Sequence, residues 1–76
     1  MPTGRRVVLY TAQGCSLCRR AKDVLQRLQV EHSEVDITGD PALEPRYREW
    51  LPVVEIDGER AFVFFLDEDA LLRKLG

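Results

Sequence analysis

Long hydrophobic segments are missing from this 76-residue sequence, whose longest apolar run, Ala61–Leu66, has only six residues. A transmembrane helix takes about 20 apolar residues, so none is expected. The N-terminal segment Met1–Arg6 has two arginines, but the apolar strand after it is shorter than the roughly 7–15 residues of a signal peptide core. We therefore expect a cytoplasmic protein that does not bind membranes.

An excess of one charge is also missing, since 11 basic and 13 acidic residues give a formal net charge of −2. These charges are interspersed and form no basic stripe, so nucleic acid is not an expected partner. The hydrophobic fraction of 45% and the charged fraction of 32% are typical of a globular domain. A chain this short buries only roughly 60% of its unfolded surface. We therefore predict one domain over residues 1–76 with a single core, and we expect a monomer.

Cysteine is scarce, and the two that are present, Cys15 and Cys18, are separated by only two residues. A disulfide that closes so short a loop stabilises a fold by about 2 kcal/mol, against about 3 kcal/mol for a fifteen-residue loop. The pair is therefore better explained by reactive chemistry than by cross-linking. Half of a zinc or iron–sulfur site has the same spacing, but His32 is the only histidine. A metal site needs a second chain or carboxylate ligands. This dimeric metal-binding module remains an alternative, as does a redox-inert interaction domain.

Apolar periodicity predicts seven elements in the order β-α-β-α-β-β-α. Strands are predicted at Val7–Thr11, His32–Ile37, Val53–Ile56 and Arg60–Phe65, and helices from Cys15 to about Gln29, from Pro41 to about Leu51, and after Asp67. The first strand–helix–strand unit implies parallel strands. The Asp57-Gly58 pair predicts a two-residue hairpin turn. Together these elements predict an α/β fold with a four-stranded mixed sheet flanked by helices.

The segment Cys15–Cys18 begins the first predicted helix. Residues three apart share a helix face, so the two sulfurs can bond. The unpaired amides and the dipole of the first turn favour negative charge on Cys15, and Arg19 and Arg20 add positive charge nearby. Such settings lower a thiol pKa to roughly 3.5–7.5. We predict that Cys15 is the nucleophile and the less exposed Cys18 the resolving thiol, in disulfide exchange through a mixed disulfide.

The stretch Tyr10–Cys18, the segment Leu51–Val54 and the Asp57-Gly58 hairpin resemble the glutaredoxins, and more narrowly the small bacterial glutaredoxin-like proteins. The resemblance extends from Val7 to Leu75. It implies a thioredoxin-like fold and a thiol–disulfide oxidoreductase in which Cys15 attacks and Cys18 resolves.

The resemblance also implies a substrate-binding region. Pro52 is expected to be a cis-proline that faces the active-site loop, which leaves the Leu51 backbone free to pair with an extended substrate. Gln13 and Gly14, just before Cys15, complete the predicted substrate-binding residues.

Four positions depart from the glutaredoxin pattern. Ala12 stands where a basic residue is usual, Leu17 replaces the aromatic residue between the cysteines, and Phe62-Val63 replaces a Gly-Gly pair. These side chains predict that glutathione is a poor ligand. The expected substrate is a disulfide in a protein or a small thiol compound, and the expected electron donor is a reductase or glutathione. We expect no metal and no cofactor apart from the Cys15–Cys18 disulfide.

Two aromatic features allow more than one interpretation. Trp50 either lines the substrate groove or packs against a helix end. The run Phe62–Phe65 either forms a surface for a partner or buries alternate residues under the last helix. Tyr10 is predicted to lie in the core. For Trp50 and Phe62–Phe65, packing is the simpler explanation.

Overall fold

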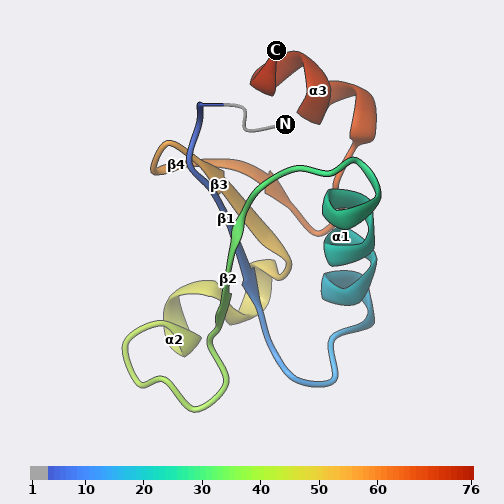
Figure 1. Cartoon of the computed structure of the whole chain (residues 1–76). Coiled ribbons are helices and arrows are strands. Elements are labelled where there is room, and N and C mark those ends of the chain that lie inside the picture. Colours follow the sequence, from blue (N-terminus) through green and yellow to red (C-terminus); the bar gives the residue numbers. More distant parts are fainter. Residues whose placement is uncertain (1–3) are drawn as a thin grey trace.

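The computed structural model describes residues 4–76, and residues 1–3 of the predicted domain lie outside the described residues. Its elements are β1 (Val7–Thr11), α1 (Ser16–Arg27), β2 (Ser33–Asp36), α2 (Glu44–Tyr47), the 3₁₀ helix η1 (Arg48–Trp50), β3 (Val53–Ile56), β4 (Glu59–Val63) and α3 (Glu68–Leu75) (Figure 1). The order predicted from periodicity is confirmed. Within residues 4–76, no helix has both the length and the apolar character that a membrane span requires.

The four strands form one mixed sheet in the order β2-β1-β3-β4. The inner strand β1 pairs parallel with β2 and antiparallel with β3, with Leu9 opposite Val54. The hairpin of β3 and β4 turns at Asp57-Gly58, where both residues adopt positive φ. The predicted mixed sheet and its hairpin are therefore present.

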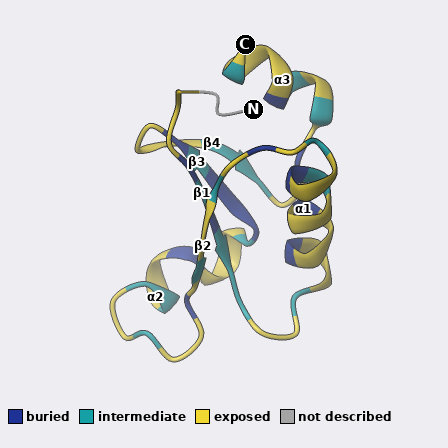
Figure 2. Ribbon diagram, viewed as in Figure 1, coloured by how far each residue is buried: buried dark blue, intermediate teal, exposed yellow. Residues whose placement is uncertain are grey.

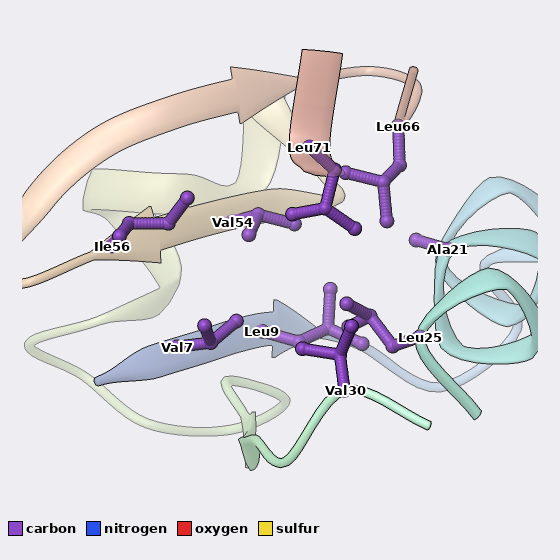
Figure 3. Close-up of a cluster of buried hydrophobic side chains, with 9 residues drawn as sticks. All are labelled: Val7, Leu9, Ala21, Leu25, Val30, Val54, Ile56, Leu66 and Leu71. Atoms are coloured by element: carbon purple, nitrogen blue, oxygen red, sulfur yellow. The ribbon is translucent and has the colours of Figure 1, made fainter. Parts of the chain in front are cut away.

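Alternating residues of the strands divide the hydrophobic core between the two faces of the sheet. One face packs against α1 and α3, and its main cluster brings Leu9 of β1 together with Leu25 and Leu71 of these helices (Figure 3). The other face carries α2, whose buried Tyr47 packs with Ile37 and Val53. The buried strand residues lie in the inner strands β1 and β3, and further buried residues lie on the helices, as Figure 2 shows. The sheet therefore separates two hydrophobic clusters of unequal size.

Helix α1 is shorter than predicted at both ends. Cys15 is the N-cap and not the first helical residue, with an extended φ of −94° and ψ of 106°. The helix ends at Arg27, because Gln29 adopts a left-handed φ of 58° that an α-helix cannot contain. The predicted amphipathic face is correct, since Ala21 and Leu25 are both buried.

The predicted helix Pro41–Leu51 is wrong in its extent. The carboxylate of Asp40 does cap, accepting the amides of Ala42 and Leu43, but it holds them in a turn before the helix. Pro45 then lies in the first turn of α2 and has no amide to extend the helix backwards. As a result, a four-residue α-helix follows the turn and continues as η1 up to Trp50.

Two strands also end earlier than the apolar pattern predicts. Strand β2 covers Ser33–Asp36 within the predicted His32–Ile37. Strand β4 ends at Val63 and not at Phe65, because Phe64 turns into a left-handed conformation with φ of 69°. By contrast, the predicted cap of the last helix is correct, since the Asp67 carboxylate accepts the Ala70 amide at 3.2 Å.

Candidate active site

The cysteine pair lies at the carboxyl end of the inner strand β1, where the chain turns into α1. The loop after Thr11 contains Gly14, whose φ of 75° is left-handed and suits a residue without a Cβ. This turn places Cys15 at the N-cap of α1, with its Cα 5.2 Å from that of Cys18. The two sulfurs are joined in a disulfide. The predicted closeness of the pair is therefore confirmed.

The two sulfurs lie in different surroundings. Cys15 is partly exposed, whereas Cys18 is only 1% exposed beneath the first turn of α1. The Cys18 amide N–H donates to Sγ of Cys15 at 3.1 Å. A donor at this position stabilises negative charge on the outer sulfur when the disulfide is opened. Arg19 and Arg20 are exposed, so solvent weakens their effect on that charge.

A groove of about 340 Å³ opens beside Cys15. Four of the six predicted site residues line it, namely Gln13, Gly14, Cys15 and Leu51. The other two are covered: Cys18 lies behind its partner, and Pro52 is fully buried next to Leu51. The Leu51-Pro52 peptide bond is cis, as the resemblance implied. The structure thus gathers the predicted residues in one place, while their roles stay predictions.

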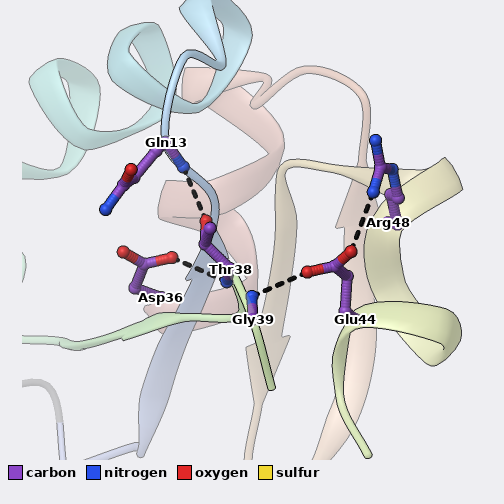
Figure 4. A network of polar contacts seen from close by, with 6 residues as sticks. All are labelled: Gln13, Asp36, Thr38, Gly39, Glu44 and Arg48. Carbon is purple, nitrogen blue, oxygen red and sulfur yellow. Dashed lines mark hydrogen bonds and ion pairs between the residues drawn. The ribbon is translucent and has the colours of Figure 1, made fainter. Parts of the chain in front are cut away.

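The groove is also lined by Thr38, Glu44 and Arg48, which belong to a polar network that sequence reasoning missed. The backbone amide of Gln13 donates to Oγ1 of Thr38 at 2.9 Å, and the backbone amide of Thr38 donates to the Asp36 carboxylate at 2.8 Å (Figure 4). Glu44 of α2 accepts the Gly39 amide at 2.7 Å and pairs with Arg48 at 2.8 Å. The hydrogen bonds from the Thr38 amide and hydroxyl lower the pKa of Asp36. The Asp-x-Thr pattern is a turn signal that could have located the start of this network.

A second feature beside the cysteines is an exposed apolar patch, here called the aromatic surface: Leu17, Trp50, Phe64 and Phe65. Leu17, Phe64 and Phe65 line one shallow hollow together with Arg20. The Trp50 ring lies 5.9 Å from that of Phe64. Because Leu17 stands between the two cysteines, this surface adjoins the disulfide on the side of α1.

The aromatic surface corrects the simpler explanation given above for the run Phe62–Phe65. Phe62 packs against the main cluster, but Phe64 and Phe65 are 45% and 69% exposed, so burial of alternate residues ends with β4. Trp50 is 41% exposed and is not among the residues that line the groove beside Cys15. The guanidinium of Arg60 lies 5.7 Å from its ring centroid.

Tyr10, predicted to be core, is half-buried on the α2 side of the sheet. Its ring stacks on that of Tyr47 at 4.2 Å, and both hydroxyls donate to the carboxylate of Glu55. Burial, with further contributions from Tyr47 and Glu55, raises the pKa of Tyr10 to about 12. This cluster is structural, because Glu55 satisfies both hydroxyl groups away from the disulfide.

Metal ligands do not gather in the part of the chain that the structure covers: no three His, Cys, Asp or Glu side chains of residues 4–76 lie close enough to hold an ion. The cysteine pair is thus the one cluster of soft ligands within that range.

Comparison with known proteins identifies a matching family and several proteins of similar sequence or structure. Residues 6–76 match the Glutaredoxin-like domain (DUF836). An uncharacterized protein of Mycobacterium tuberculosis is 33% identical over 75 residues, which cover 87% of this chain and 77% of that protein. A protein of X. campestris has a similar structure, with a TM-score of 0.78, 28% identity and coverage of 91% and 93% of the two chains.

Two further structures are similar in fold. The protein Ne2328 of Nitrosomonas europaea superposes with a TM-score of 0.79 at 28% identity, covering 95% of this chain and 92% of the other. The glutaredoxin-like NrdH-redoxin of Escherichia coli, described as having a thioredoxin-like activity profile, superposes with a TM-score of 0.69 over 90% of this chain and 92% of its own. At 21% identity the latter shows the fold alone. The sheet and helices described above are therefore of the thioredoxin-like α/β type.

Proposed function

The chain belongs to the family of glutaredoxin-like domains, and from this premise we propose that it is a thiol–disulfide oxidoreductase that uses Cys15 and Cys18. The observation that carries the proposal is the asymmetry of the pair. One sulfur opens to a groove and accepts an amide hydrogen bond at a helix N-terminus, and the other is buried one turn further on. An exchange reaction needs this division between an attacking and a resolving thiol.

The proposed reaction runs in two displacements. In the reduced protein, the Cys15 thiolate attacks one sulfur of a target disulfide, and the other target sulfur leaves as a thiolate with the electron pair of the broken bond. Cys18 then loses its proton and attacks Sγ of Cys15, which releases the second target sulfur as a thiolate. The target gains two electrons and takes up protons from solvent, while the protein becomes the disulfide seen in the structure. A dithiol reductase or two glutathione molecules return the electrons.

The surroundings of Cys15 support a peptide or protein disulfide as substrate. The aromatic surface offers contact area for apolar side chains next to the target cysteine, since exposed apolar patches mark contact sites. Leu51 adopts an extended backbone in the wall of the groove, which suits pairing with an extended segment. Phe62 and Val63, which replace the Gly-Gly pair of the resemblance, pack against the two hydrophobic clusters and do not line the groove beside Cys15. We propose that the protein acts on such targets in the cytoplasm, without a metal or cofactor.

Alkylation tests this proposal directly. The reduced protein is treated with iodoacetamide between pH 4 and 9, and mass spectrometry follows modification of Cys15. We expect a midpoint below pH 7, because the helix N-terminus and the Cys18 amide stabilise the thiolate. A midpoint near the ordinary thiol value of about 8.5 would contradict the assignment.

Turnover gives the matching functional test. The wild type should catalyse reduction of insulin disulfides by dithiothreitol, Cys15→Ser should abolish that catalysis, and Cys18→Ser should accumulate a mixed disulfide detectable by mass. Equal activity of Cys15→Ser and wild type would refute the mechanism.

A further inference from the structure

The loop that carries Cys15 is held by a side chain from a different part of the chain. Gln13 lies two residues before Cys15, in an exposed loop between β1 and α1. Its amide N–H donates to Oγ1 of Thr38, 25 residues later, at 2.9 Å. Because Gln13 and Gly14 are exposed, they gain little positional restraint from packing. The hydrogen bond to Thr38 therefore restrains the part of the loop, Gln13 and Gly14, that side-chain packing does not hold in place.

Thr38 is itself fixed in position on two sides. Its own amide donates to Asp36 at the end of β2, at 2.8 Å. The next residue, Gly39, donates its amide to Glu44 of α2 at 2.7 Å, and Glu44 is held by Arg48 one turn later (Figure 4). The hydroxyl that meets the Gln13 amide is thus attached to both the sheet and α2, so it can act as a fixed point.

We propose that Thr38 is a positioning residue for Cys15: its hydroxyl holds the loop of residues 12–14 so that the outer sulfur stays at the N-terminus of α1. This role rests on the proposed function, in which Cys15 is the attacking thiol. In the reduced protein no bond joins the two sulfurs. The loop before Cys15, together with the Cys15 carbonyl that accepts the Arg19 amide, then keeps Sγ of Cys15 near the Cys18 amide, 3.1 Å away in the structure. A loop released from Thr38 samples positions in which that sulfur has left the helix N-terminus and its stabilising amide.

The hydroxyl is a selective target because it is uncharged. Thr38→Val has nearly the same shape and keeps the charged groups of Glu44 and Arg48. Asp36 loses the hydrogen bond from the Thr38 hydroxyl but keeps the one from the Thr38 amide, and at an ordinary carboxyl pKa of about 3.9 it stays ionised at pH 6, so a change of charge cannot explain an effect on Cys15 there. Thr38→Ser keeps the accepting oxygen and serves as the conservative variant. Asp57→Ala is the control for general destabilisation, because it removes an acceptor of the Arg6 amide at the opposite end of β1 from Cys15.

The experiment measures the pH midpoint of Cys15 alkylation by iodoacetamide in each reduced variant. For Thr38→Val we expect the midpoint to rise by about 0.5–1 pH unit, which slows alkylation about 3- to 10-fold at pH values more than about one unit below the wild-type midpoint. Thr38→Ser and Asp57→Ala should stay within about 2-fold of wild type. If Thr38→Val does not fold, Thr38→Ala takes its place under the same criteria.

Three outcomes overturn the role of Thr38. One is a wild-type midpoint in Thr38→Val. The second is a shift in Thr38→Ser as large as that in Thr38→Val, because the oxygen is then not the cause. The third is an equal shift in Asp57→Ala, which would trace the effect to lost stability. These results leave a low wild-type midpoint intact, whereas a wild-type midpoint near 8.5 removes the proposed function and with it the thiolate that Thr38 is proposed to position.

Discussion

Replacing Phe64 tests whether the backbone that presents the aromatic surface is strained. Phe64 has a φ of 69°, a conformation that glycine adopts freely and that costs a residue with a Cβ about 1–2 kcal/mol. At an ordinary position, glycine is less stable than alanine by roughly 0.5–1 kcal/mol, owing to its greater freedom in the unfolded chain. The difference predicts that Phe64→Gly is more stable than Phe64→Ala by about 0.5–1 kcal/mol.

The comparison with wild type follows from the exposure of the ring. Phe64 is 45% exposed, so its removal loses about half of the roughly 1.5–3 kcal/mol that full burial of such a side chain contributes. Relief of the backbone strain offsets most of this loss. We therefore expect the free energy of unfolding of Phe64→Gly to lie within about 1 kcal/mol of wild type, far from the 3–5 kcal/mol typical of a core Phe→Ala change.

Urea denaturation followed by circular dichroism measures both differences. Phe65 is the matched control, because it is the next residue, it is 69% exposed and its φ is not positive. At Phe65 glycine should be less stable than alanine, which is the reverse of the order at Phe64. The same order at both positions would refute the strain argument. Both Phe64 variants should reduce insulin more slowly than wild type while Cys15 alkylates at an unchanged rate.

Three other properties follow from the structure. Leu9→Ala should lower the free energy of unfolding by about 2–5 kcal/mol in urea denaturation, because Leu9 is completely buried in the main cluster. The hydrogen bond from the Arg6 amide lowers the pKa of Asp57. The stability that the ionised Asp57 gives to the fold is therefore full above the ordinary pKa of 3.8 and is lost as the pH falls through the lower pKa of the folded protein. Asp57→Asn should therefore flatten the fall of the urea midpoint between about pH 5 and 2. Burial raises the pKa of Tyr10 to about 12, so its stabilisation is full below about pH 10 and is lost as the pH rises toward 12. An absorbance titration should show a phenolate midpoint near 12 that Tyr10→Phe lacks.

Much of the fold could be predicted because it depends on local patterns. The strand Val7–Thr11 has the predicted bounds, since a short run of β-branched and aromatic residues ends at a glycine-containing loop. The Asp57-Gly58 turn and the Asp67 cap follow from the chemistry of single residues. The cysteine pair and its position at a helix N-terminus could also be predicted, because they depend on spacing and on one strand-to-helix transition.

The remaining features depend on contacts between distant segments. The contact of Thr38 with the loop before Cys15 spans 25 residues and cannot be inferred from the composition of either loop. The outward turn at Phe64 defeats the apolar pattern. The Phe64 amide still donates to the carbonyl of Pro52, its partner across the hairpin, at 3.1 Å, but the φ of 69° at Phe64 turns the chain out of the strand. The early break of the second helix was predictable in principle, since Pro45 lacks the amide that a longer helix requires.

Because β1 has a hydrogen-bonded neighbour on each side, the chain segment leading to Cys15 emerges from the part of the sheet that frays last. Transient opening of the outer strand β4 can then occur without detaching β1, whereas opening of β2 would also release Asp36 and Thr38, which hold the loop before Cys15. Amide hydrogen exchange should accordingly be slowest in β1 and β3. The protein should also retain its redox activity at low denaturant concentrations that already open β4.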